Sequence, residues 1–359
     1  PPWAVGGAWE VRGRRKILKL NMAGLGDIVM MTPALRAIRA AWPDARVELL
    51  TIDRSAELAA GLEGLDAVHS VPIHYRVPGP LALWRFAAKL LELRREGFDA
   101  LVNFSLVSSY AGLLKSRLIN ALVRPGLASC RVMKGLGRCG TYTAYEAGIE
   151  EKSEPCLTAE LLKPLGLEVL DLEIKYSPDL ESRRAVSADL ASRGLAGRPL
   201  IGLNPGAFRP SRRWPLPKWK ELAALLLEKY PSALLVVTGS PAERAMCAEL
   251  CVSDRVFNAA GLYGVRGNAA LYSMTDVFIT NDTGPMHIAA ASGAKVVCIF
   301  GPGDHRRFAP SVPEARRRIL RKDLPGCRVP CYRFDCADPA CLEAISPAEV
   351  LAAAAELIG

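Results

Sequence analysis

The sequence predicts an α/β protein built from two doubly wound domains, each with its own parallel sheet. Short β-rich runs alternate with stretches of helical periodicity from one end of the chain to the other, which is the pattern of repeated βαβ units. A chain of 359 residues is too long for one ordinary domain and comfortable for two. Half of the residues are apolar and 23% are charged, as in a globular protein with a sizeable core. Two such domains are expected to face a central cleft.

The first half of the chain contains the elements of the first sheet. Strands are predicted at 16–20, 46–51, 67–71 and 98–104, and helices between them at 33–42, 56–62 and 81–95.

A second series of the same kind begins near residue 199. Strands are predicted at 199–203, 233–238, 276–280 and 295–300, and helices at 218–229, 242–251 and 269–274. The segment 165–198, with Pro178 and the turn signals at Gly194 and Gly197, is predicted to be the interdomain region. The predicted domains are therefore 1–178 and 179–345, followed by a C-terminal helix in 346–359 with Ser346 as its N-cap.

The charge balance favours a polyanionic partner. Lys and Arg number 46 against 37 Asp and Glu, a net charge of +9. This charge would fit a phosphorylated glycolipid, an anionic membrane face or nucleic acid. The alternative is a solvated basic surface that binds no such partner. No nucleic-acid module and no run of aromatic residues interleaved with Lys and Arg appears, so no nucleic-acid partner is expected.

The predicted helix 81–95 is the best candidate for membrane contact. Arg85 and Lys89 interrupt its apolar run, which is too short to cross a bilayer. One face of this helix is apolar and basic residues flank it (Leu81, Trp84, Ala88 and Leu91; Arg85, Lys89, Arg94 and Arg95). Peripheral contact with an anionic membrane and an ordinary amphipathic helix of a domain are both consistent with this pattern.

A glycine-rich turn follows the first predicted strand. Gly24 and Gly26 allow a sharp turn and the close approach of a ligand at the carboxyl end of the strand, where open α/β sheets bind ligands. Thr32 and Pro33 are predicted to cap and begin the next helix. Asp27 is either a local cap or a carboxylate that accepts a proton from an incoming hydroxyl.

The first predicted strand of the second half ends in a comparable turn. Asn204 and Gly206 form it, and Arg212, Arg213 and Trp214 follow. Guanidinium groups bind phosphate in bidentate fashion, so Arg212 and Arg213 are candidate diphosphate contacts. The alternative is two solvated arginines beside a tryptophan in the core.

The segment 281–287 is the sharpest local motif. Asp282, Thr283 and Gly284 stand between a predicted strand and a helix, where free N–H groups and the helix dipole favour a phosphate. His287, one turn into the helix, is a further candidate donor. The alternative is that Asp282 or Thr283 is an N-cap and His287 a satisfied buried histidine.

Four of the ten cysteines lie close together in the segment 325–341, namely Cys327, Cys331, Cys336 and Cys341. This segment is rich in Pro and poor in apolar residues, so a cross-link would help to hold it. Four thiolates on a structural zinc or iron, two disulfides and four free thiols all remain open. The other six cysteines are expected to be reduced.

Taken in order and spacing, these segments resemble glycosyltransferase family 9, the ADP-heptose:lipopolysaccharide heptosyltransferases. The similarity runs from 16–18 through the Gly-Asp turn to 281–287, then Phe300-Gly301-Pro302 and the Cys-rich segment. The resemblance implies a GT-B fold of two Rossmann-like domains, with the acceptor on the N-terminal domain and an ADP-sugar donor on the C-terminal one. It also implies an inverting reaction without a catalytic metal.

The resemblance assigns roles to individual residues. Asp27 matches the catalytic aspartate of the family, with Gly24 and Gly26 in the acceptor-side loop. Glu243 stands where a family glutamate holds the donor ribose. The other residues of the predicted donor site are Asn204, Gly206, Arg212, Asp282, Thr283, Gly284 and His287. Asn204 replaces a histidine common in the family, and Ala23-Gly24 replaces a Ser-rich pair, which leaves the exact sugar and acceptor open.

The resemblance therefore predicts transfer of a heptose from ADP-heptose to a phosphorylated glycolipid, the inner core of lipopolysaccharide. The alternatives are a related transferase that glycosylates a protein of the autotransporter type, one that uses another nucleotide sugar, and a non-catalytic nucleotide- or nucleic-acid-binding protein. In some relatives that glycosylate autotransporters the Cys-rich segment binds iron. The expected location is the cytoplasm, with peripheral contact at the inner face of the inner membrane.

Overall fold

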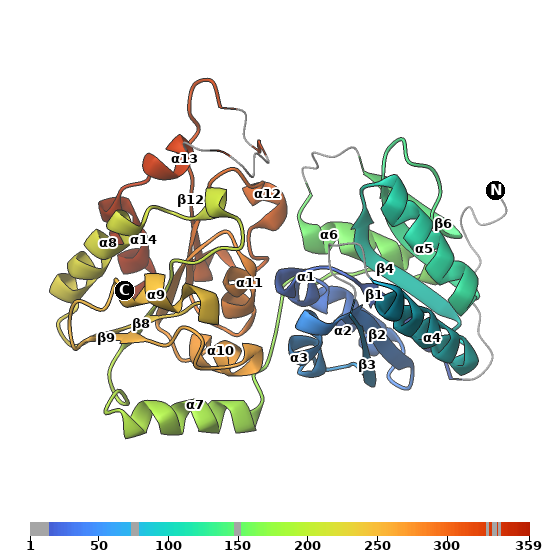
Figure 1. Cartoon of the computed structure of the whole chain (residues 1–359), viewed down its shortest axis with the longest axis horizontal. Helices are drawn as coiled ribbons and strands as arrows, with labels where there is room; N and C mark the ends of the chain where they lie inside the picture. The colour runs from blue at the N-terminus through green and yellow to red at the C-terminus, as the bar shows by residue number, and fades with distance from the viewer. Residues whose placement is uncertain (1–13, 73–78, 147–151, 328–329, 332–335, 337–338) are drawn as a thin grey trace. The chain divides into compact units, whose positions relative to one another are not determined.

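The chain forms two compact units, Pro1–Leu172 and Glu173–Gly359, in a computed structural model (Figure 1). The structure describes residues 14–72, 79–146, 152–327, 330–331, 336 and 339–359. The first unit ends six residues before the predicted boundary at 178. Each unit contains a six-stranded parallel sheet with helices on both faces, which confirms the predicted pair of doubly wound sheets.

The sheet of the first unit has the strand order β3-β2-β1-β4-β5-β6. This is the Rossmann order 3-2-1-4-5-6, in which the chain starts in the middle and builds outward in both directions. The four predicted strands are present, and β5 and β6 were missed. The strands are β1 (Lys16–Asn21), β2 (Arg46–Ile52), β3 (Ala67–Val71), β4 (Ala100–Val107), β5 (Leu127–Met133) and β6 (Tyr142–Glu146).

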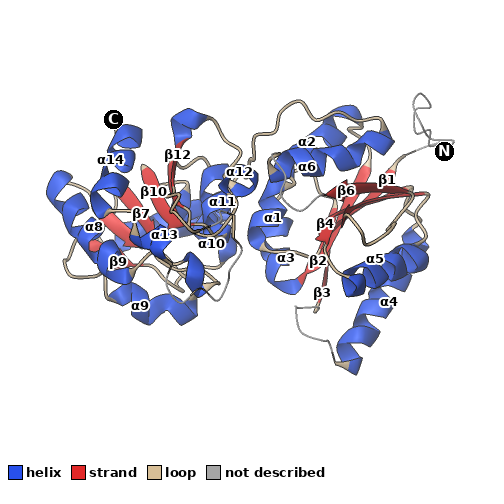
Figure 2. Ribbon diagram, turned by 90° about the horizontal axis from the view of Figure 1, so that it is seen from above, coloured by secondary structure: helices blue, strands red, loops and turns tan. Residues whose placement is uncertain are grey.

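Helices cover both faces of this sheet (Figure 2). On one face α4 (Pro80–Glu96) and α5 (Tyr110–Val123) pack side by side, with Phe86, Leu90 and Ile119 in a core shared with β1 and β4. On the other face lie α2 (Thr32–Ala41), α6 (Glu154–Ala159) and the 3₁₀ turn η1 (Glu160–Leu165). The short helices α1 (Leu25–Met30) and α3 (Asp53–Ala60) follow β1 and β2.

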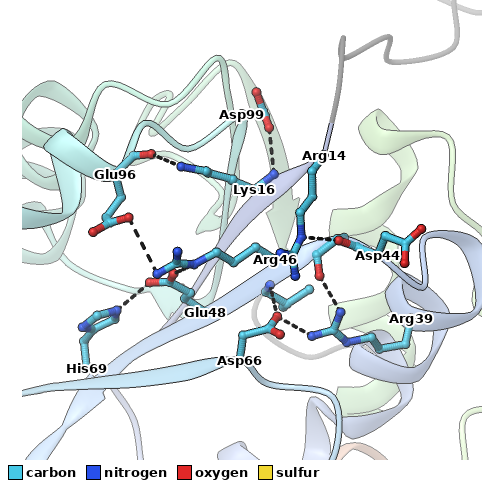
Figure 3. A network of polar contacts seen from close by, with 12 residues as sticks. Arg14, Lys16, Arg39, Asp44, Arg46, Glu48, Asp66, His69, Glu96 and Asp99 are labelled. Atoms are coloured by element: carbon cyan, nitrogen blue, oxygen red, sulfur yellow. Dashed lines mark hydrogen bonds and ion pairs between the residues drawn. The ribbon is translucent and has the colours of Figure 1, made fainter.

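A network of charged groups holds the amino ends of the first strands together (Figure 3). Asp99 accepts from the backbone N–H of Lys16, with 2.7 Å between Oδ2 and N. Glu48 is fully buried and pairs with Arg46 and with His69, whose Nε2 lies 2.6 Å from Glu48 Oε2. Because ligands of such sheets bind at the opposite, carboxyl edge, this network stabilises the fold.

The sheet of the second unit repeats the same order, β9-β8-β7-β10-β11-β12. Its first strand, β7 (Leu200–Asn204), pairs with β8 (Leu234–Val237) on one side and β10 (Val277–Asn281) on the other. The sheet is completed by β9 (Val256–Asn258), β11 (Val296–Ile299) and β12 (Arg317–Leu320). The four predicted strands of this half are all present.

Two apolar cores flank the second sheet. One contains α8 (Leu216–Lys229) and α14 (Pro347–Ile358), and the other contains α7 (Leu180–Ser192) and α10 (Val265–Tyr272). The remaining elements are α9 (Arg244–Ala248), α11 (Gly284–Ala291), α12 (His305–Phe308), α13 (Ala340–Glu343) and the 3₁₀ turns η2 (Pro210–Arg212), η3 (Pro241–Glu243) and η4 (Glu314–Arg316).

The structure confirms the predicted N-cap of the C-terminal helix but not the predicted interdomain segment. Ser346 is the N-cap of α14, and its side chain accepts from the N–H of Glu349 at 3.3 Å, which confirms the predicted cap. The segment 165–198, predicted as interdomain, instead contains α7, which buries Val186 and Leu190 against the second sheet. Among the described residues no helix is both long and apolar enough to cross a membrane.

Candidate functional site

Both sheets place their predicted site residues at a topological switch point. The strand order reverses between β1 and β4 in the first unit and between β7 and β10 in the second. In open α/β sheets the ligand binds beyond the carboxyl ends of the strands at this point. Gly24, Gly26 and Asp27 follow β1. Asn204 and Gly206 lie at the end of β7, and the segment 282–284 follows β10.

Buried amides hold the turn after β7 in place. Asn204 Nδ2 donates to the carbonyl of Gly206 at 3.2 Å, and Thr238 Oγ1 donates to Asn204 Oδ1 at 3.3 Å. Asn281 Nδ2, from the end of β10, donates to the carbonyl of Pro205 at 2.9 Å. The ends of three neighbouring strands are therefore tied together, and the turn is fixed before any ligand arrives.

Arg212 forms an ion pair with Asp282 at the carboxyl edge of the second sheet. Arg212 Nη1 lies 3.2 Å from Asp282 Oδ2 and 3.4 Å from the carbonyl oxygen of Asp282. Asp282 is almost fully buried, so desolvation raises the pKa of its carboxyl group, and the charge of Arg212 opposes this rise. The pair fixes the guanidinium at the end of the sheet, where a phosphate could bind to it.

Gly303, in the loop after β11, leaves room for this pair. A Cβ added at Gly303 would lie 2.2 Å from Asp282 Oδ2, closer than any real contact. The residue is therefore required by close approach, since any larger side chain would displace the carboxylate of Asp282.

Glu243 approaches the turn after β7 from the β8 side. Its Oε2 accepts from both the N–H and the hydroxyl of Ser240, at 2.8 and 2.7 Å. A Cβ added at Gly206 would lie 2.3 Å from Glu243 Oε1, so the carboxylate rests directly against the Cα of that glycine. The structure thus brings Glu243 next to Gly206, although the two are far apart in sequence.

The helix α11 begins in the predicted motif. Thr283 occupies the N-cap position with an extended backbone, but its side chain makes no capping hydrogen bond. Gly284 and Pro285 start the first turn, and His287 is buried within it. The dipole of this eight-residue helix and its first N–H groups favour an anion beside Asp282.

Asp27 is the third residue of α1. Its Oδ2 accepts from the N–H of Gly24 at 2.9 Å, so the carboxylate does cap the turn. Burial, together with the negative charge of Glu154, raises the pKa of Asp27 to about 6, while the bond from Gly24 and the charge of Arg131 oppose the rise. At neutral pH the group is therefore ionised and yet more basic than an ordinary aspartate, as a general base requires.

One capping prediction for the same loop is wrong. Met31, and not Thr32, is the N-cap of α2, and Thr32 lies inside the helix. Its hydroxyl donates to the carbonyl of Val29 at 2.8 Å, closing the junction between α1 and α2. Pro33 stands in the first turn of α2, as predicted.

A buried ion-pair cluster near Asp27 was missed from the sequence. Arg131, on β5, pairs with Glu146 at 3.2 Å between Nε and Oε1 and hydrogen-bonds to Glu154 through Nη2. All three side chains are buried. The three residues lie on β5, β6 and α6, none of which was predicted, so no sequence signal linked them to Asp27.

Cys327, Cys331 and Cys341 are free thiols, as are the six cysteines outside the Cys-rich segment. Burial raises the pKa of Cys341, and the neighbouring Cys331 and Cys327 raise it further. Residues 328–329, 332–335 and 337–338 of the predicted Cys-rich segment lie outside the described residues. Among the residues that are described, no group of three or more His, Cys, Asp or Glu side chains is arranged to hold a metal ion.

Comparison with protein families and curated proteins identifies relatives. A model of glycosyltransferase family 9 (heptosyltransferase) matches residues 156–327. Lipopolysaccharide heptosyltransferase 2 of Escherichia coli K12 is 25% identical over 318 residues, which cover 85% of this chain and 88% of that protein. Lipooligosaccharide heptosyltransferase 2 of Campylobacter jejuni is 28% identical over 170 residues, so the match spans only about half of that relative's length (52%).

Solved structures share the fold over nearly the whole chain. A family 9 glycosyltransferase from Veillonella parvula gives a TM-score of 0.75 at 20% identity, covering 96% of this chain and 97% of that one. The ADP-heptose lipopolysaccharide heptosyltransferase II of Escherichia coli gives 0.70 at 19% identity, covering 96% and 98%. The likeness confirms the predicted GT-B fold class. The family model over residues 156–327 and the curated relatives make the chain similar to glycosyltransferase family 9 (heptosyltransferase).

Proposed function

We propose that the chain is an inverting glycosyltransferase that moves a heptose from ADP-heptose to an inner-core acceptor of lipopolysaccharide. Two features carry the proposal: Asp27 in the first unit, whose pKa is raised to about 6, and a preformed cationic edge around Arg212 on the second sheet. Curated relatives that bear lipopolysaccharide heptosyltransferase names support the choice of substrates.

On the donor side, the residues around β7 and β10 hold ADP-heptose. Arg212 and the N-terminus of α11 bind the diphosphate, and His287 and Thr283 are further donors to it. Glu243, beside Gly206, accepts hydrogen bonds from the ribose hydroxyls. Asn204 keeps its turn rigid through its own hydrogen bonds and does not need to touch the ligand.

On the acceptor side, Asp27 is the base. The acceptor hydroxyl gives its proton to the Asp27 carboxylate while its oxygen attacks the anomeric carbon. The bond from that carbon to the β-phosphate oxygen breaks, and its electron pair leaves with ADP. Arg212 and the α11 N–H groups stabilise the negative charge that grows on the phosphate, which lowers the barrier.

Two finer features belong to the same proposal. One is a structural zinc or iron on Cys327, Cys331, Cys336 and Cys341; these side chains do not form a ligand set in this structure, so metal binding would require the four thiols to draw together. Elemental analysis of wild-type protein and of Cys331→Ser tests it, and a metal-free, stable and active wild type would exclude it. The other is a cytoplasmic location with peripheral contact at the inner membrane.

A panel of nucleotide sugars tests the donor. The protein is incubated with ADP-heptose, an ADP-hexose and a UDP-hexose, each with and without heptose-deficient lipopolysaccharide, and the released nucleotide is measured. The proposal expects acceptor-dependent ADP release from ADP-heptose. Release mainly from the UDP-sugar, or transfer only to a protein acceptor, would favour the alternative transferases.

A further inference from the structure

The first unit exposes an unusual amount of apolar surface on two neighbouring helices. Of the 13 exposed large hydrophobic side chains among the described residues, seven lie on α4 and α5. They are Leu81, Leu83, Trp84, Leu91, Tyr110, Leu114 and Leu118. Trp84 is 67% exposed, Tyr110 69% and Leu114 66%. A cluster of this kind on a soluble domain marks an interaction surface.

These side chains lie on the helix faces that the core does not use. On α5, Tyr110, Leu114 and Leu118 recur at intervals of four residues and form one stripe, while Ile119 and Val123 are buried against the sheet. A helix with an ordinary solvated face would carry polar residues in that stripe. The helix α5 is therefore apolar on both its inner and its outer face.

On α4 the corresponding positions are Trp84 and Leu91, with Leu81 beside them, and Phe86 and Leu90 face the core. Since α4 and α5 pack against each other on the same face of the sheet, the two outer stripes belong to one surface (Figures 1 and 2). We call it the α4/α5 face, defined by the seven exposed side chains above.

The charge of the same helices is complementary to an anionic bilayer. The two helices carry six Lys and Arg against Glu92 and Glu96, a net charge of +4 (6 − 2). Exposed Arg94 and Arg95 lie in the last turn of α4. Trp and Tyr prefer the interface of a bilayer, where an apolar ring meets polar headgroups, and basic side chains there bind anionic lipids.

We propose that the α4/α5 face docks the enzyme peripherally on an anionic phospholipid bilayer, with the apolar stripes in the interface and the basic residues on the headgroups. This inference rests on the proposed function, because a glycolipid acceptor is anchored in such a bilayer. Docking raises the local concentration of that acceptor without any membrane-spanning segment.

Vesicle flotation tests the face directly. Wild-type protein is mixed with phosphatidylethanolamine vesicles that contain or lack phosphatidylglycerol. Wild type should float with the anionic vesicles. Binding of Trp84→Ser/Leu114→Ser should fall about a hundredfold, because each of the two large apolar side chains withdrawn from water contributes about tenfold. The matched control is Leu180→Ser, which changes an exposed leucine on α7 in the second unit.

A charge-reversal pair tests the electrostatic part. Arg94→Glu/Arg95→Glu should lose binding to anionic vesicles, and the wild-type binding should weaken as salt is added. The control Arg183→Glu/Arg184→Glu reverses an adjacent, exposed arginine pair on α7 and should float like wild type. Equal flotation of wild type, Trp84→Ser/Leu114→Ser and Arg94→Glu/Arg95→Glu would overturn the inference.

Activity separates this inference from the proposed function. Trp84→Ser/Leu114→Ser should transfer to a soluble, delipidated acceptor at the wild-type rate and to vesicle-embedded lipopolysaccharide more slowly. Flotation without any transfer in wild type would contradict the proposed function alone. A wild type that does not float but dimerises, and becomes monomeric in this double variant, would show that a second copy of the chain covers the face, and would overturn the bilayer proposal.

Discussion

The two units share one strand order but equip their carboxyl edges differently. In the second unit, side chains from β7, β8 and β10 and the loop after β11 are joined by hydrogen bonds, an ion pair and close glycine contacts. In the first unit, Asp27 is held by one backbone N–H and stands near buried charges that tune its pKa. A rigid cationic edge suits a phosphate, and a carboxylate with a raised pKa suits a proton.

The two units also differ in how much apolar surface they expose. Among the residues that the structure describes, nine of the 13 exposed large hydrophobic side chains belong to the first unit and four to the second. In the proposed function, the same fold would bind two substrates of different chemistry. The half that we propose to bind the nucleotide needs preorganised polar groups, whereas the half that we propose to bind a glycolipid also needs apolar surface.

The largest expected effect comes from Asp27→Asn. The amide cannot accept a proton at neutral pH, so the transfer rate should fall about 10²–10⁴-fold. Calorimetry should find ADP affinity unchanged, since the residue belongs to the first unit. The exposed Asp44, in the loop before β2, gives the matched control Asp44→Asn. Near-normal turnover of Asp27→Asn would end its assignment as the base.

Removing the cation of the second unit should have the next largest effect. Arg212→Ala removes a phosphate contact and leaves the buried Asp282 without its partner, so donor affinity should fall roughly 30-fold or more. Arg212→Lys should restore part of it, because the charge remains while the bidentate geometry is lost. An unchanged dissociation constant for ADP would place the diphosphate elsewhere.

Close packing against Asp282 predicts a smaller loss from Gly303→Ala. The added methyl group would push the carboxylate away from Arg212 and weaken donor binding about tenfold, with about 1–3 kcal/mol lost from the free energy of unfolding. Gly79→Ala is the control, since a Cβ there meets nothing within 4 Å. Titration with ADP and thermal unfolding measure both quantities, and identical behaviour of the two variants would contradict the close approach.

The smallest effect is a shift in pH dependence. With the pKa of Asp27 raised to about 6, the transfer rate should rise with pH as that carboxyl ionises. Glu154→Gln removes a negative charge that raises this pKa, so the rising limb should move to lower pH. Glu160→Gln, a change of the same charge on the neighbouring turn η1, is the control. A shift to higher pH in Glu154→Gln would contradict the assigned electrostatics.

The elements with a clear period were predictable, and those without one were not. The eight predicted strands are short runs between turn signals, seven of them mostly buried, and all are present. The helix α5 was missed because apolar residues on both faces hide its period, and α7 because it buries only Val186 and Leu190. The strand β6 was also missed. It lies at the edge of the sheet, where one side is exposed to solvent, so its apolar and polar residues are mixed without a clear period.

Candidate site residues were predictable where they belong to one turn. Asp282, Thr283 and Gly284 follow each other between a strand and a helix, and the motif itself indicates an anion site. The approach of Glu243 to Gly206 depends on the pairing of β7 with β8, and the link from Arg131 to Asp27 depends on strands that the sequence did not reveal. Long-range contacts of this kind require the assembled sheet.

Heptose transfer is tested most directly by the mass of the acceptor. Wild-type protein is incubated with ADP-heptose and heptose-deficient lipopolysaccharide, and the acceptor is analysed by mass spectrometry alongside the released ADP. The acceptor should gain the mass of a single heptose, matched mole for mole by released ADP, and this gain should be nearly abolished in Asp27→Asn. Release of ADP with no change in the acceptor mass, or a mass gain that does not depend on Asp27, would contradict the proposed function.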